Sequence, residues 1–188
     1  MARDIQTGFN DGRRARAEAP LREGLYKLKE ARRYPNRVLD ILDDLMAAKR
    51  NNQPVTHVLF GDSPRIWAMR WLDELAYRAG KDLLPSIEAL TGDGVPASVI
   101  QPCLPKLRQM ESTLLGDIER AEWQIRSWGI GYEYERWTSG DSALIDPCVN
   151  FLAITEIGLR LVDENLPNRL SGSERDEFFR PHPKLVAY

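Results

Sequence analysis

Two helical patterns in the second half of the chain constrain its fold most strongly. In the first, between positions 105 and 128, apolar residues recur at steps of three and four: Leu107, Met110, Leu114, Ile118, Ala121, Ile125 and Trp128. These steps place all seven on one face of a helix, and Gly129 follows where helices commonly end. The pattern predicts a long amphipathic helix with one face against a core.

The second pattern predicts a helix that begins at Asp146-Pro147, with Asp146 as the N-cap and Pro147 at the first helical position. Residues 148–162 are apolar around most of the helical circumference, which is typical of a central buried helix. We expect the long amphipathic helix to pack against it. Together the two patterns predict a mainly α protein, a single helical domain around a buried central helix.

Shorter helices are predicted in the first half of the chain. Pro20 is expected to start one helix, and Tyr34-Pro35 is expected to break it. Asn36 then has the side chain of an N-cap for the next helix. The prolines therefore predict two short helices in this region.

The sequence predicts at most a minor β element. Residues 55–60 are β-branched and aromatic, and residues 132–136 alternate with period two, so each segment is a candidate strand. Two short strands cannot support a sheet-based fold. Between the two candidate strands, Ser63-Pro64 is predicted to open a helix that ends at Gly80.

Length and composition indicate one domain with flanking arms. A chain of 188 residues suits one domain and can bury a core without metal or disulfide cross-links. We divide it into a basic N-terminal arm (1–19, flexible or partly helical), a helical domain (20–166) and an extended C-terminal tail (167–188). The tail is assigned because Pro167 marks the expected end of regular structure.

Charge is distributed unevenly along the chain. Residues 1–37 carry ten Lys/Arg against five Asp/Glu, a net charge of +5, so the remainder carries −7 of the total of −2. This asymmetry is typical of an arm that meets an anionic partner. The alternative is a solvated helix face with ion pairs such as Glu23 with Lys27.

The leading functional expectation is a non-enzymatic interaction protein, meaning an assembly subunit, adaptor or inhibitor. It would contact a protein or nucleoprotein partner through its arms. An alternative is a nucleic-acid-binding protein that uses the basic arm, since clustered cations suffice for contact with a phosphate backbone. The residues assigned to partner binding are Arg13, Arg14, Arg16, Arg32, Arg33, Phe178 and Phe179.

A catalytic alternative rests on one motif. Residues 58–63 (Val-Leu-Phe-Gly-Asp-Ser) resemble the opening block of the SGNH/GDSL hydrolases. The resemblance implies a small serine esterase on an α/β sheet, with Ser63 as nucleophile and His182 as base, near Asp176. The family's Gly-x-Asn-Asp block is absent, and Phe179 stands where the family has Asp. The competing interpretation of Ser63 is a helix N-cap.

The remaining signals concern location, cofactors and tryptophans. Cys103 and Cys148 give no disulfide framework, and the first residues form no apolar signal region, so a cytoplasmic location is expected. No segment is long and apolar enough to span a membrane. No metal or cofactor is expected, because ligand spacings and phosphate-binding loops are absent. Five tryptophans are interpreted mainly as core residues, and an exposed one would mark a partner surface.

Overall fold

The described part of the chain is helical. The computed structural model describes residues 2–53, 64–89, 96–127, 143–166 and 171–179, and all of its regular secondary structure in these ranges is helix. The predicted mainly α class is confirmed. The candidate strands 55–60 and 132–136 lie outside the described residues, as do the side chains of residues 2–18 and 177–179.

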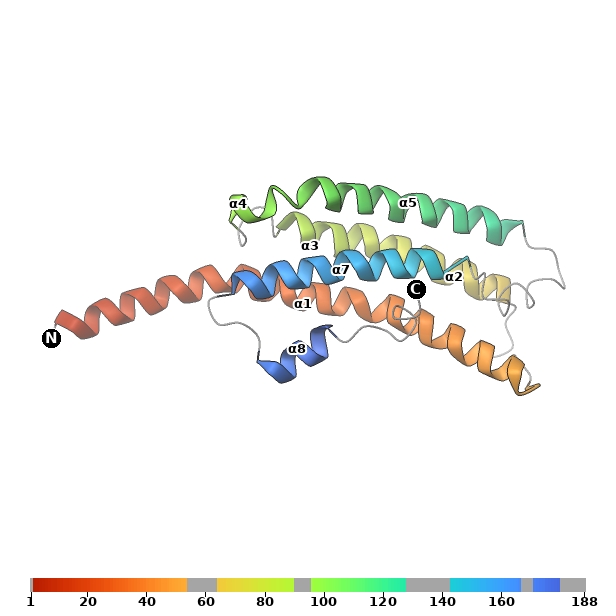
Figure 1. Cartoon of the computed structure of the whole chain (residues 1–188), viewed down its shortest axis with the longest axis horizontal. Coiled ribbons are helices and arrows are strands. Elements are labelled where there is room, and N and C mark those ends of the chain that lie inside the picture. Colours follow the sequence, from red (N-terminus) through yellow and green to blue (C-terminus); the bar gives the residue numbers. More distant parts are fainter. Residues whose placement is uncertain (1, 54–63, 90–95, 128–142, 167–170, 180–188) are drawn as a thin grey trace.

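The long helices form a bundle in which neighbours are antiparallel (Figure 1). The elements are α1 (Ala2–Arg50), α2 (Pro64–Arg78), the π-helix η2 (Ala79–Leu83), α3 (Leu84–Ala89), α4 (Ala97–Ile100), α5 (Leu104–Arg126), α7 (Ile145–Asn165) and α8 (Gly172–Phe179). α7 packs against α1 and α5, while the continuous run α2–η2–α3 packs against α1 and α5 from the other side. The chain therefore runs up, down, up and down through α1, α2–η2–α3, α5 and α7.

The predicted central helix is confirmed in α7. Its buried residues are Ile145, Pro147, Cys148, Phe151, Leu152, Ile154, Thr155, Gly158, Leu159, Leu161, Val162 and Asp163. The predicted stripe on α5 is also buried at Leu107, Leu114, Ile118, Ala121 and Ile125. α5 packs against α7 as predicted. Trp128 and Gly129 lie outside the described residues.

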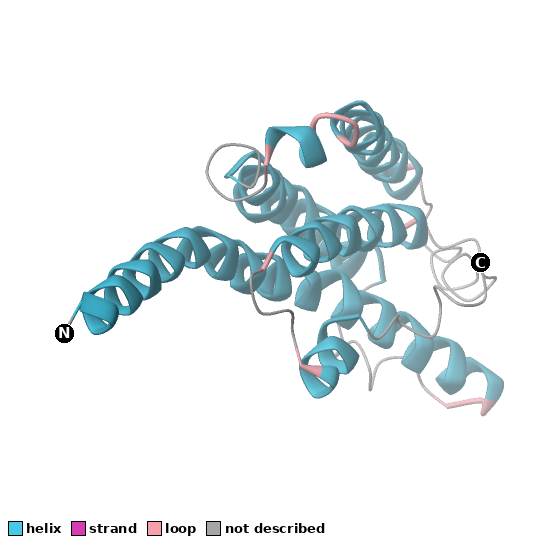
Figure 2. Ribbon diagram, turned by 60° about the vertical axis from the view of Figure 1, so that its left-hand side comes forward, coloured by secondary structure: helices cyan, strands magenta, loops and turns pink. Residues whose placement is uncertain are grey.

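The predicted breaks in the first helix are wrong, because α1 continues through both Pro20 and Pro35. A proline inside a helix costs about 3 kcal/mol. Leu28, Leu39 and Leu42, on either side of Pro35, are fully buried, and each contributes about 1.5–3 kcal/mol by burial. Burial therefore exceeds the cost of the proline. Figure 2 shows α1 bent rather than straight, as expected of a helix that contains prolines.

Two further helix boundaries differ from the prediction. The helix from Pro64 does not end at Gly80, since a π-turn continues it into α3 and keeps Ala79 and Leu83 in the core. α7 begins at Ile145 with Leu144 at the N-cap position, so Asp146 is not the cap. Burial of Leu144 and Ile145 explains why the helix starts two residues earlier than predicted. Asp146 instead places its charge in the first turn, where the helix dipole favours it.

The C-terminal region is not wholly extended as predicted, because it contains the helix α8. A capping box begins this helix. The Ser171 hydroxyl accepts the backbone N–H of Glu174 at 3.4 Å, and the Ser171 N–H donates to the Glu174 carboxylate at 2.9 Å. The Ser-x-x-Glu spacing is visible in the sequence, but the prediction of an extended tail (167–188) did not use it.

No helix in the described ranges combines the length and the apolar character needed to cross a membrane. The division at 19/20 and 166/167 stays a prediction. α1 itself runs across the first of these boundaries without interruption.

Candidate functional site

The arginines assigned to partner binding lie at different places along α1. Arg13, Arg14 and Arg16 belong to its N-terminal part, which projects beyond the other helices (Figure 1), and their side chains lie outside the described part. Arg32 is half-buried over the bundle. Arg33 is exposed and pairs with Glu30 at 2.9 Å. The five arginines therefore divide into a projecting group and a group on the bundle.

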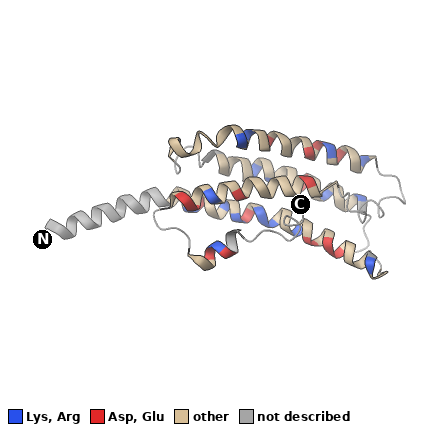
Figure 3. Ribbon diagram, in the orientation of Figure 1, with Lys and Arg blue, Asp and Glu red and all other residues tan. Residues whose placement is uncertain are grey.

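The bundle itself carries charges of both signs, interspersed along every long helix in the view of Figure 3. Several of these charges form pairs one helical turn apart. The predicted Glu23–Lys27 pair is confirmed at 2.8 Å. The solvated-face interpretation therefore holds for this part of α1.

α8 carries the C-terminal candidates and is attached to the bundle by an ion pair. Arg175 donates through Nε at 2.9 Å and Nη2 at 2.5 Å to one carboxylate oxygen of Asp163 on α7. The Asp163 side chain is only 3% exposed, so its charge requires such partners. The side chains of Phe178 and Phe179 lie outside the described part.

Electrostatic interactions relate α8 to α1. Hydrogen bonds from the Ser171 backbone and hydroxyl hold the pKa of Glu174 below its ordinary value of 4.5. The Arg22 and Lys29 cations of α1 lower this pKa further. The start of α8 is thus an acidic cap that faces basic residues of α1.

The esterase residues are not brought together within the described part of the chain. Ser63 and His182 lie outside it, and Asp176 is an exposed residue of α8. The resemblance to SGNH/GDSL hydrolases implies an α/β sheet, whereas the described ranges contain only helices. Both cysteines are free; Cys148 is buried at the start of α7 and Cys103 is half-buried. The described residues contain no group of three or more potential metal ligands.

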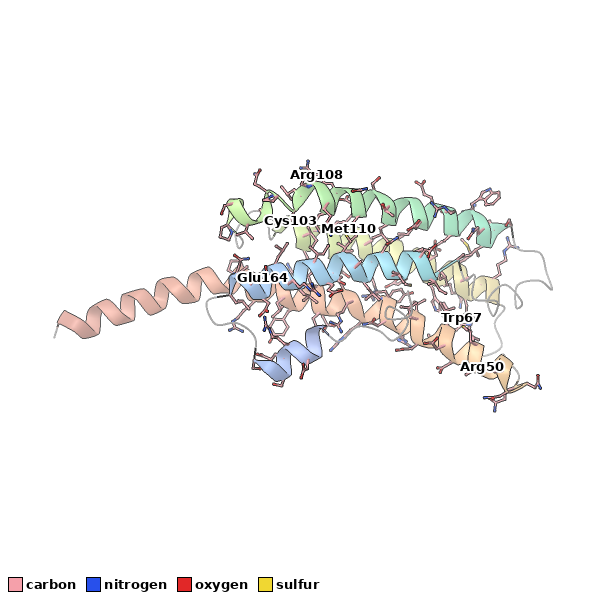
Figure 4. All side chains as sticks on the ribbon, viewed as in Figure 1. Arg50, Trp67, Cys103, Arg108, Met110 and Glu164 are labelled. Atoms are coloured by element: carbon pink, nitrogen blue, oxygen red, sulfur yellow. The ribbon has the colours of Figure 1, made fainter. Side chains whose placement is uncertain are left out.

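A groove between α1 and α2 was not foreseen from the sequence. It has a volume of about 750 Å³, and its walls come from the C-terminal half of α1 and the N-terminal half of α2. Trp67 and Trp71 form its aromatic side, with ring centroids 5.2 Å apart (Figure 4 labels Trp67). Arg37 and Asp44 of α1, and Arg70 of α2, supply charged groups.

Contacts of Tyr34 and Arg78 organise the end of the groove nearest the middle of α1. The Tyr34 hydroxyl donates to the backbone carbonyl of Trp71 at 3.4 Å. The Arg78 guanidinium lies 5.0 Å from the centre of the Tyr34 ring and binds Glu74 at 2.8 Å. Burial of the phenol, followed by the nearby Glu74 charge, raises the pKa of Tyr34 above its usual range. The phenol therefore remains a hydrogen-bond donor at neutral pH.

Arg37 and Asp44 are exposed charges of the groove, and neither makes an ion pair with another described residue. Arg37 is the cation of the two, and its charge acts on Tyr34. The groove can thus hold an apolar group against Trp67 with an anionic group at Arg37. The steps from Tyr34 to Arg37 and Ile41 could have indicated this face, but the predicted break at Pro35 separated Tyr34 from the other two.

A smaller hollow of about 300 Å³ lies farther along the same seam, where η2 meets α1. Lys81 of η2 donates to the Tyr77 hydroxyl at 2.7 Å, and this bond raises the pKa of Lys81. Tyr26 and Glu30 line the α1 side. Its smaller volume makes this hollow a weaker candidate than the groove beside Trp67.

No protein family model matches the chain, and neither the curated proteins nor the solved structures contain one with significant similarity to it.

Proposed function

We propose that the chain is a non-enzymatic interaction protein, an assembly subunit, adaptor or inhibitor, that binds an anionic protein or nucleoprotein partner through the N-terminal part of α1. One observation carries this proposal: α1 continues past the bundle with its basic segment on the projecting part (Figure 1). A single helical segment of this length is only marginally stable in water. Contact with a partner would stabilise it.

The sequence of the projecting part supports an anionic partner. Arg13, Arg14 and Arg16 lie within four residues of one another. Three clustered cations attract a carboxylate-rich surface or a phosphate backbone, and both attractions weaken as salt rises. In the more specific form of this proposal, the anionic partner is a nucleic acid that the projecting part of α1 binds directly.

The groove beside Trp67 supplies a second contact in this proposal. Its Arg37, which makes no ion pair with another described residue, and its aromatic wall suit a partner segment that presents an apolar side chain next to a carboxylate. A cytoplasmic location belongs to the proposal as well. The two free cysteines are compatible with a reducing compartment.

The test compares two probes, a short duplex DNA and an acidic peptide, at several salt concentrations. We expect the triple variant Arg13→Gln, Arg14→Gln, Arg16→Gln to lose most of the binding to at least one probe. If DNA is the ligand, the slope of log affinity against log salt should fall by about 0.9 for each phosphate contact removed.

A matched control removes three cations elsewhere: Arg50→Gln, Lys106→Gln and Arg160→Gln. All three residues are exposed, and none lies on the projecting part of α1. An equal loss of positive charge there should therefore leave most of the binding intact. Equal weakening by the control variant would show that net charge, not the projecting helix, governs binding, and would contradict the proposal.

A further inference from the structure

The outer face of α5 carries apolar side chains that the bundle leaves uncovered. Trp123 is 71% exposed, and Leu115 is 45% exposed. Trp123 follows the fully buried Leu114 by nine positions, about two and a half helical turns, so it points away from the core. Tryptophan is among the residues that dominate the energy of protein interfaces. This position therefore indicates a contact surface.

Two charges lie on the same side of α5 as the uncovered apolar residues. Arg108 and Glu119 are exposed, and neither makes an ion pair with another described residue, whereas Arg120 and Arg126 on the same helix are paired. Figure 4 shows Arg108 pointing away from the bundle. The two charges are eleven positions apart, about three turns, and so lie on the same side of α5.

The order of residues on this side is self-complementary. We define the α5 outer face by the following residues, in sequence order: Leu104, Arg108, Ser112, Leu115, Glu119 and Trp123. Leu104 is half-buried and packs partly against the core, so only its outer side contributes to this face, whereas the other five residues are exposed. Read from either end, the face presents an apolar residue, a charge, a middle section, the opposite charge and an apolar residue. Arg108 stands four positions after Leu104, and Glu119 stands four positions before Trp123.

We propose that two copies of the chain associate antiparallel through the α5 outer face. Each Arg108 then meets Glu119 of the second copy, and each Trp123 packs beside Leu104 of the second copy. This arrangement is an isologous two-fold interface, in which both copies use the same surface. A uniformly acidic or basic partner would satisfy only one of the two charges, so a second copy fits the face better.

The apolar part of the interface is tested by Trp123→Ala in sedimentation equilibrium. The wild type should show a concentration-dependent dimer, and the variant should raise the dimer dissociation constant by about thirty-fold or more. Tyr26→Ala is the matched control, since Tyr26 is a similarly exposed aromatic residue on α1. It should leave the dissociation constant unchanged.

The charge pairing is tested by reversing each charge. Arg108→Glu and Glu119→Arg should each weaken the dimer, because each variant alone brings like charges together. The double variant restores opposite charges across the two-fold axis and should dimerise again. An equimolar mixture of the two single variants should form a heterodimer for the same reason.

Several results would overturn the proposal. A wild type that stays monomeric at the highest concentration that it tolerates would do so. A dimer that persists equally in Trp123→Ala would place the interface elsewhere on the molecule. Failure of both the double variant and the mixture to recover association, with helix content unchanged by circular dichroism, would show that Arg108 and Glu119 do not meet.

Discussion

α1 passes through two different environments, and the comparison between them explains much of the molecule. From Leu21 onward the helix is packed into the bundle, and its buried residues are Leu21, Leu25, Leu28, Ala31, Val38, Leu39, Leu42, Leu45 and Ala48. Before Leu21 the same helix projects past its neighbours (Figure 1). Tertiary packing stabilises the first environment, whereas the second depends on local helix propensity and, in our proposal, on a partner.

The largest expected difference between the two parts is the effect of truncating a side chain. Leu39 is fully buried in the packed part, so Leu39→Ala should lower the free energy of unfolding by about 2–5 kcal/mol. Leu114→Ala on α5 should fall in the same range. Arg14→Ala in the projecting part is the control, expected within about 0.5 kcal/mol. Urea unfolding of the three variants measures this, and equal effects would remove the distinction between the two parts.

The second prediction concerns how the packed region holds α8. Arg175→Ala removes the Arg175 ion pair from the buried carboxylate of Asp163 and should cost about 1–3 kcal/mol. The cost stays below that of a fully buried pair because the Arg175 side chain is 45% exposed. Arg33→Ala, which breaks an exposed pair with Glu30, should cost at most about 1 kcal/mol. Thermal unfolding would contradict this account if Arg33→Ala cost as much as Arg175→Ala.

Glycine-to-alanine substitutions should show a smaller difference in stability between the packed region and the projecting part of α1. A Cβ on Gly158 of α7 would lie 2.8 Å from methyl groups of Leu28 and Ile87. Gly158→Ala should therefore destabilise the protein by about 1 kcal/mol, since overpacking outweighs the gain in helix propensity. Gly12→Ala in the projecting part should instead raise helix content without lowering the unfolding temperature. Stabilisation by Gly158→Ala would show that α1 and α7 are less closely packed than described.

The smallest expected effect is on pH dependence, at the cap of α8. The pKa of Glu174 is lowered in the folded state. The ionised carboxylate therefore contributes to folding stability above the ordinary pKa of 4.5, and this contribution is lost as pH falls through the lowered pKa. NMR amide shifts of Ser171 should report the loss of the cap in acid. Glu174→Gln should remove this titration. A titration that persists in Glu174→Gln would assign it to another group.

These results show which features the sequence could predict. The long periodic stripe predicted α5 correctly, because the spacing of Leu107, Leu114 and Ile118 encodes which face is buried. The apolar circumference of residues 148–162 predicted the buried helix α7 correctly. Single-residue signals failed at Pro35 and Gly80. At both positions the burial of neighbouring apolar residues exceeded the local preference of the chain.

The candidate sites were less predictable for a different reason. The groove beside Trp67 requires that the faces of α1 and α2 meet, and this depends on the topology of the bundle rather than on either helix alone. The exposure of Trp123 likewise depends on the arrangement of the bundle, which leaves the outer side of α5 uncovered. The sequence allowed for an exposed tryptophan at a partner surface, but it gave no means of choosing which one.

Deleting residues 2–18 tests most directly the claim that one part of α1 maintains the fold and the other binds the partner. We expect the free energy of unfolding to change by no more than about 0.5 kcal/mol, while most of the binding to at least one of the two probes, duplex DNA or the acidic peptide, is lost. A truncated protein that unfolds as readily as Leu39→Ala, or that binds both probes as tightly as the full chain, would contradict it.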